Sequence, residues 1–116
     1  MFNYAVILIA LGAVIGLYMA IQHFRGRTPP RGMVAATHGL LAVSGVIVLL
    51  IAARESGLRG AGPWALWLFG IAALGGLYLA TQHMDQKRLS GGIIVVHAVI
   101  AVVAFLITLT AVYLVP

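Results

Sequence analysis

Four long runs of apolar residues, separated by three short polar segments, dominate the pattern of this chain. The runs cover residues 4–21, 33–53, 63–80 and 93–115, and no Lys, Arg, Asp or Glu interrupts any of them. A bilayer core about 30 Å thick is crossed by about 20 apolar residues of α-helix, so each run has the length of a membrane span. The pattern therefore predicts four transmembrane helices.

The polar segments between the runs decide how these helices are connected. They lie at residues 24–32, 54–62 and 84–92 and contain nearly every charged residue. Connections this short force consecutive helices to run antiparallel, side by side. We therefore predict an all-α membrane protein, a four-transmembrane-helix up-down-up-down bundle that forms a single transmembrane domain over residues 1–116.

The composition agrees with a membrane-embedded chain. Of the 116 residues, 63% are hydrophobic and 8% are charged, whereas a soluble domain is about half apolar and about a quarter charged. A soluble enzyme, a disordered segment and a disulfide-stapled secreted domain are therefore excluded. The first run has no basic segment before it, so we expect it to be a membrane helix and not a cleaved signal peptide.

The net charge of +5 is distributed unevenly over the connections. The second connection carries Arg54 and Arg59, whereas the first and third together carry Arg25, Arg27, Arg31, Lys87 and Arg88. Cytoplasmic connections are enriched in Lys and Arg, so we expect the first and third connections in the cytoplasm and both termini outside. The basic residues thus indicate orientation in a membrane, expected to be a bacterial inner membrane, and not a nucleic-acid partner.

The two halves of the chain repeat each other. Residues 16–23 read Gly-Leu-Tyr-Met-Ala-Ile-Gln-His, and residues 76–83 read Gly-Leu-Tyr-Leu-Ala-Thr-Gln-His, with six of eight positions identical. The second and fourth runs match more loosely around their histidines. We predict two tandem parallel helical-hairpin repeats, residues 1–58 and 59–116, related by a pseudo-two-fold axis along the membrane normal.

The chain has four histidines, one in each predicted helix and each at a repeat-matched position: His23, His38, His83 and His97. The connectivity places all four toward the same side of the membrane. A single histidine in a membrane helix often only hydrogen-bonds a neighbouring helix, but intramembrane ionisable groups are expensive and tend to be functional. Four histidines in two matched pairs favour ligation of a metal or cofactor.

The residue types narrow the choice of metal centre. Imidazole suits iron, copper, zinc and nickel, and the absence of cysteine removes thiolate sites and iron–sulfur clusters. A carboxylate-bridged site would need inward acidic residues, but Glu55 and Asp85 both lie in connections. Bis-histidine haem is therefore the leading expectation.

Small and basic residues near the histidines fit the same interpretation. Gly16, Gly76, Gly45 and Ala101 share helix faces with the histidines and lie toward the membrane middle, where they leave room for a flat cofactor. Such residues can equally serve close packing of helices. Basic residues at this side of the membrane can pair with haem propionates or only fix the topology; the two singled out are Arg25 and Arg88.

An apolar four-helix bundle with one repeat-matched histidine per helix resembles the small four-span membrane b-type cytochromes, the cytochrome b561-like proteins. The resemblance implies non-covalent haem b, two haems with axial ligands His23, His38, His83 and His97, and electron exchange with quinone, ascorbate or a partner redox protein. This sequence departs from that family in one respect. The family places its haems toward opposite membrane faces, whereas the four histidines here lie toward one side.

Several alternatives remain open from the sequence. His38 pairs with His97 and His23 with His83, or the pairs cross as His23–His97 and His38–His83, or one haem binds His38 and His97 alone. For the function, we expect electron transfer to or from quinone or a partner redox protein, in preference to enzymatic turnover of a substrate. The alternatives are a non-haem protein that binds copper, zinc or iron, and a structural or assembly subunit of a larger complex. A homodimer is also compatible with the sequence.

Overall fold

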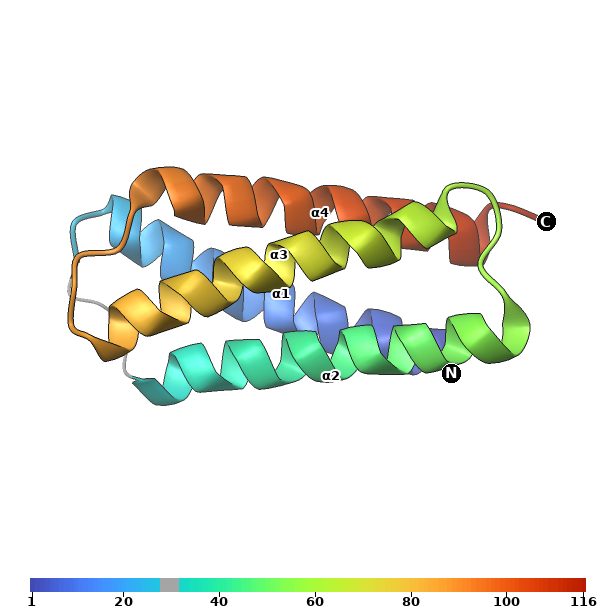
Figure 1. Ribbon diagram of the computed structural model, residues 1–116, viewed down its shortest axis with the longest axis horizontal. Helices are drawn as coiled ribbons and strands as arrows, with labels where there is room; N and C mark the ends of the chain where they lie inside the picture. The colour runs from blue at the N-terminus through green and yellow to red at the C-terminus, as the bar shows by residue number, and fades with distance from the viewer. Residues whose placement is uncertain (28–31) are drawn as a thin grey trace.

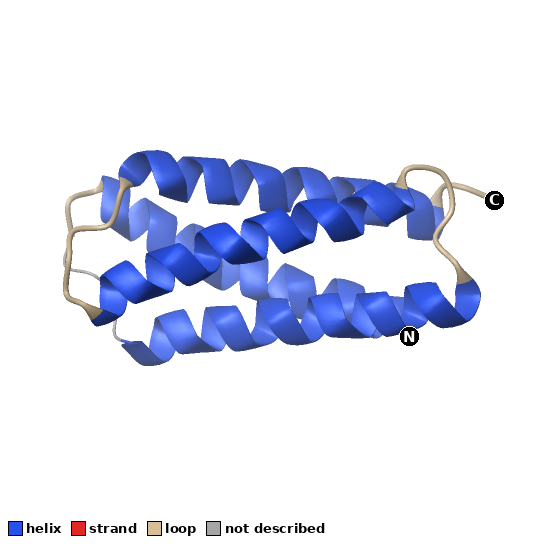
Figure 2. Ribbon diagram, viewed as in Figure 1, coloured by secondary structure: helices blue, strands red, loops and turns tan. Residues whose placement is uncertain are grey.

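The computed structural model describes residues 1–27 and 32–116 and contains four α-helices in this part of the chain. They are α1 (Phe2–Phe24), α2 (Gly32–Ser56), α3 (Gly62–Met84) and α4 (Gly91–Tyr113). Consecutive helices run in opposite directions along a bundle of 45 × 23 × 19 Å, and both termini lie at the same end (Figure 1). Only helices and loops are drawn for the described residues (Figure 2). The predicted all-α up-down-up-down bundle is confirmed.

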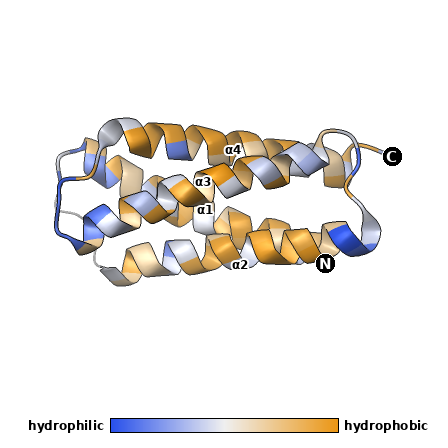
Figure 3. Ribbon diagram, in the orientation of Figure 1, coloured by the Kyte–Doolittle hydropathy of each residue, from blue (hydrophilic) through white to orange (hydrophobic). Residues whose placement is uncertain are grey.

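Each helix is 23 to 25 residues long and apolar enough to cross a membrane. The hydropathy colouring is apolar along the middle of the bundle and hydrophilic at the connections (Figure 3). Large apolar side chains cover the outer surface, among them Leu11, Leu40, Leu74 and Val99. Such a surface is stable against lipid and not against water. The chain is therefore a transmembrane four-helix bundle.

The two hairpins bury matching faces. The buried residues of α1 and their counterparts in α3 are Ala5 and Ala65, Ile9 and Phe69, and Gly12 and Ala72. Those of α2 and α4 are Gly45 and Ala104, Leu49 and Thr108, and Ala52 and Ala111. Most of these side chains are small, which lets neighbouring helices approach closely. The boundary of the predicted repeats falls in the connection between α2 and α3.

Helices α1 and α3 end in the same type of cap. Gly26 and Gln86 both have positive φ, 68° and 55°. The N–H of Gly26 donates to the carbonyl oxygen of His23 at 3.0 Å, and the N–H of Gln86 donates to that of His83 at 3.2 Å. In both caps the next N–H bonds the carbonyl oxygen five residues back, at 3.1 and 2.9 Å, which completes a Schellman motif. The caps hold His23 and His83 in the last helical turn.

The two hairpins are packed more closely within themselves than against each other. A core cluster formed by all four helices joins the hairpins; it contains Ala5, Ile9, Leu49, Phe69 and Ala104. At the end that holds the termini, the hydroxyl of Tyr113 donates to the side-chain oxygen of Asn3. The cluster lies in the half of the bundle nearer the termini.

The other half of the bundle has little fully buried core. Within residues 13–24, 32–44, 73–84 and 91–103, the only buried residue is Ile94. These ranges contain all four histidines. The histidines therefore lie where the interior is least filled by large apolar side chains.

Candidate functional site

The structure brings His38 and His97 together at the interface between the two hairpins. Their ring centroids are 6.2 Å apart, and the ring planes are at 83° to each other. His38 is on α2 and His97 on α4, so each hairpin contributes one imidazole. Both side chains are half-buried.

Each of these imidazoles is fixed by a hydrogen bond to the backbone of its own hairpin. Nδ1 of His38 is 2.7 Å from the carbonyl oxygen of Gly12, and Nδ1 of His97 is 2.7 Å from that of Ala72. A carbonyl oxygen only accepts hydrogen bonds, so Nδ1 must be the protonated donor in the neutral ring. Nε2 of each ring then keeps its lone pair, which is the arrangement of a histidine that ligates a metal through Nε2.

Gly16 and Gly76 provide the space in which the two rings lie. A Cβ atom added at Gly16 would be 2.7 Å from Cε1 of His38, and one added at Gly76 would be 3.0 Å from Cε1 of His97. Both distances are shorter than ordinary van der Waals contacts between carbon atoms, which are about 3.5–4.0 Å. The two glycines selected from the sequence therefore contact the imidazoles directly.

The other small residues selected from the sequence have different surroundings. Gly45 is buried and packs against α1, because a Cβ atom added there would be 2.6 Å from Cγ1 of Ile9. Ala101 is half-buried on α4, one turn after His97. The position of Gly45 serves the close approach of α1 and α2.

His23 and His83 lie in the last turns of α1 and α3 and are half-buried. The ring of His23 packs edge-on against Phe24, with centroids 5.1 Å apart. A Cβ atom added at Gly91 would be 3.7 Å from Nε2 of His23, so this ring lies beside the start of α4. Residues 1–27 and 32–116 contain no group of three or more His, Cys, Asp or Glu that could hold a metal ion. His23 and His83 therefore do not join the His38–His97 pair.

The basic residues selected from the sequence lie at the end of the bundle that carries the α1–α2 and α3–α4 connections. Arg25 is the C-cap residue of α1, and Arg88 follows α3; both are exposed. Arg27 and Lys87 are exposed beside them. Arg31 lies outside the described residues.

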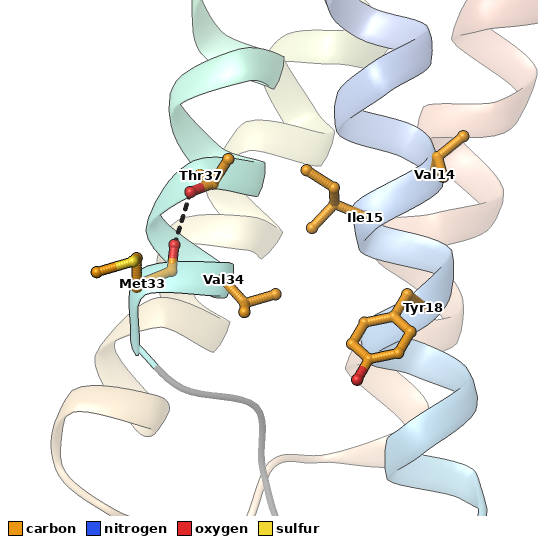
Figure 4. Close-up of a pocket in the computed structure, with 6 residues that line it drawn as sticks. All are labelled: Val14, Ile15, Tyr18, Met33, Val34 and Thr37. Atoms are coloured by element: carbon orange, nitrogen blue, oxygen red, sulfur yellow. Dashed lines mark hydrogen bonds between the residues drawn. The ribbon is translucent and has the colours of Figure 1, made fainter.

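An apolar groove of about 540 Å³ runs between α1 and α2 (Figure 4). It is lined by Val14, Ile15, Tyr18, Met33, Val34 and Thr37. None of the four histidines lines it, and four of its six lining residues are exposed. The hydroxyl of Thr37 is directed back to its own helix, where it donates to the carbonyl oxygen of Met33 at 2.7 Å. The groove is thus part of the outer surface of the first hairpin and separate from the His38–His97 pair.

Two groups of the site had not been found from the sequence, the carbonyl oxygens of Gly12 and Ala72. Backbone groups carry no residue-type signal of their own. The available signal was indirect: both residues are small, and both precede by four positions a glycine selected beside a histidine. In an α-helix, residues four apart lie on the same face.

Comparison of the chain with protein-family models, with curated proteins and with solved structures found no match. The chemically distinctive feature of the site is a pair of imidazoles, one from each hairpin, each oriented by a backbone carbonyl.

Proposed function

We propose that the protein is a membrane b-type cytochrome in which His38 and His97 are the axial ligands of one haem, and that it transfers electrons. The observation that carries this proposal is the close pair of imidazoles, one from each hairpin and each oriented through Nδ1. Two imidazoles on opposite sides of one metal ion, with metal–nitrogen distances of about 2 Å, have ring centroids about 6 Å apart. The observed separation of 6.2 Å supports this arrangement. Histidine at both axial positions favours electron transfer over binding of an external ligand.

The number of available ligands favours haem over a non-haem metal ion. A porphyrin supplies four in-plane nitrogens, so the protein needs to add only two. Zinc sites usually take three or four protein ligands, and the described residues offer no group of three. Residues 28–31, Thr-Pro-Pro-Arg, contain no imidazole, carboxylate or thiol.

The packing of the bundle also supports a bulky apolar cofactor between the hairpins. Contacts between the hairpins are sparse, and the half that holds His38 and His97 has little buried core. When bound, haem supplies a centre that takes up and releases one electron at a time. The chain's own residues would hold its iron through Nε2, fix the imidazole orientation and surround it with apolar side chains.

The distribution of basic residues supports one orientation of the protein in the membrane. Arg25, Arg27, Lys87 and Arg88 gather at one end of the bundle, and Lys and Arg are enriched on the cytoplasmic side. The proposed location is a bacterial inner membrane with this end in the cytoplasm. Electrons would be exchanged with quinone or with a partner redox protein.

Absorption spectra of the purified protein, oxidised and dithionite-reduced, test the proposal. We expect a Soret band and a reducible b-type spectrum, and we expect His38→Ala and His97→Ala each to abolish the six-coordinate low-spin form. The absence of a Soret band after haem supplementation would overturn the proposal. A wild-type spectrum in both variants would show that His38 and His97 are not haem ligands.

A further inference from the structure

The His38–His97 pair lies off-centre along the bundle. Each histidine is six residues after the start of its helix, at Gly32 and Gly91, which corresponds to about 9 Å at a rise of 1.5 Å per residue. In the other direction the helices continue to Ser56 and Tyr113, about 25 Å away by the same rise. A redox centre held by the pair is therefore much closer to one water-facing end than to the other.

The nearer end is the more positively charged one. Four basic side chains are exposed there in the described structure; we call Arg25, Arg27, Lys87 and Arg88 the basic end. With the carboxylate of Asp85 their formal charge is 4 − 1 = +3, whereas Arg54, Arg59 and Glu55 at the other end give 2 − 1 = +1. The hydropathy view shows hydrophilic segments at both ends of the bundle, including the connections at the basic end (Figure 3).

We propose that the His38–His97 centre exchanges electrons with a water-soluble redox protein that docks on the basic end through an acidic face. This inference rests on the proposed function. Electron transfer slows steeply as the distance between the centres grows, so a partner at the near end is strongly favoured over one at the far end. A cationic docking surface steers an anionic partner into contact and orients it.

Two alternatives predict different behaviour. A lipophilic carrier that reaches the centre from within the bilayer would not respond to the charge at the basic end. If the basic residues bind only anionic lipid headgroups, a soluble partner would not depend on them. Both alternatives can be separated from acidic docking by the salt dependence and the charge of the partner.

The test uses the full-length, haem-loaded protein in zwitterionic phosphatidylcholine nanodiscs, with electron exchange followed in the haem absorbance by stopped flow. The probes are an acidic plant-type ferredoxin and, for comparison, a basic cytochrome c. We expect electron exchange with the ferredoxin to slow at least about fivefold between low and high ionic strength. Exchange with the basic protein should be slow at low salt and should not slow further as salt is added.

Charge-neutralising variants locate the docking surface. In Arg27→Gln/Lys87→Gln we expect an unchanged haem spectrum, a rate with the ferredoxin lowered about fivefold at low salt, and a weaker salt dependence. The matched control, Arg54→Gln/Arg59→Gln, removes the same charge from the other end and should leave the rate unchanged. The salt dependence of the unmodified protein tests the proposal even if a variant fails to fold.

The outcomes separate this inference from the function on which it rests. An intact haem spectrum with equal rates for both probes and no salt effect would overturn acidic docking and favour a lipophilic carrier. Equal losses in the two double variants would overturn the assignment to the basic end. A protein without a haem spectrum would overturn the proposed function, and this inference with it.

Discussion

Nδ1 of His38 lies 2.7 Å from the carbonyl oxygen of Gly12, and the matching pair of the second hairpin has the same separation. In an α-helix that carbonyl also accepts the N–H four residues later, which belongs to Gly16. The imidazole approaches the carbonyl closely because Gly16 has no side chain in the way. The hydrogen bond to the carbonyl oxygen and the glycine beside the ring thus belong together. The second hairpin repeats this combination with His97, Ala72 and Gly76.

This arrangement predicts that Gly16→Ala displaces the imidazole of His38. The added methyl group would be 2.7 Å from Cε1, so the ring must move and the hydrogen bond to Gly12 is lost. Loss of the bond that orients a ligating histidine typically costs 10–100-fold in affinity. We expect haem affinity to fall about tenfold, measured by haem titration of the apoprotein. Gly76→Ala should have a smaller effect, because its clearance is 3.0 Å.

The control for both variants is Gly39→Ala on α2, where an added Cβ atom meets nothing within 4 Å. This change should leave haem affinity unchanged. If Gly39→Ala weakens haem binding as much as Gly16→Ala does, the effect does not come from contact with the imidazole.

His23→Ala and His83→Ala test how many haems the chain holds. Within residues 1–27 and 32–116, the two histidine rings that lie against each other are those of His38 and His97. We expect both variants to keep the haem content per chain of the unmodified protein, measured by pyridine haemochrome analysis. A fall to half would instead indicate a second haem and contradict a single centre on His38 and His97.

The sequence predicted the helices and their order well, because hydropathy alone marks a membrane span and short connections leave one arrangement. The choice of partner for His38 was not predictable. It depends on the rotation of α2 and α4 about their axes, and close contacts at small residues, such as that of Gly45 with Ile9, favour one rotation of a helix over others. A glycine beside a cofactor and a glycine beside another helix look alike in a sequence. Gly16 and Gly45 were therefore selected together but have different contacts.

Gln86→Gly should stabilise the bundle. Gln86 has a φ of 55°, in the left-handed region that costs a side-chain-bearing residue about 1 kcal/mol relative to glycine. We expect a gain of about 0.5–1 kcal/mol in the free energy of unfolding, measured in a mixed-micelle denaturation series. Gly26 occupies the matching cap with a φ of 68°, so Gly26→Ala should show a loss of similar size. If the two substitutions change the free energy of unfolding in the same direction, the positive φ at these caps does not determine their stability.

Gly45→Ala should separate α1 from α2. The added methyl group would be 2.6 Å from Cγ1 and 2.9 Å from the backbone nitrogen of Ile9. Because this nitrogen is part of the α1 backbone, relieving the contact requires a shift of the helix itself. Overpacking of this kind costs about 1–3 kcal/mol of stability. Gly70→Ala is the matched change at an exposed position of α3 with nothing within 4 Å. If the two variants unfold at the same denaturant concentration, the close α1–α2 contact does not limit stability.

The near-identical settings of His38 and His97 also affect how the centre would react. Each imidazole comes from the second helix of its hairpin, donates to a carbonyl on the first helix and lies against a glycine one turn further on. Neither ring is favoured as the stronger ligand, so the centre would have no proximal and no distal side.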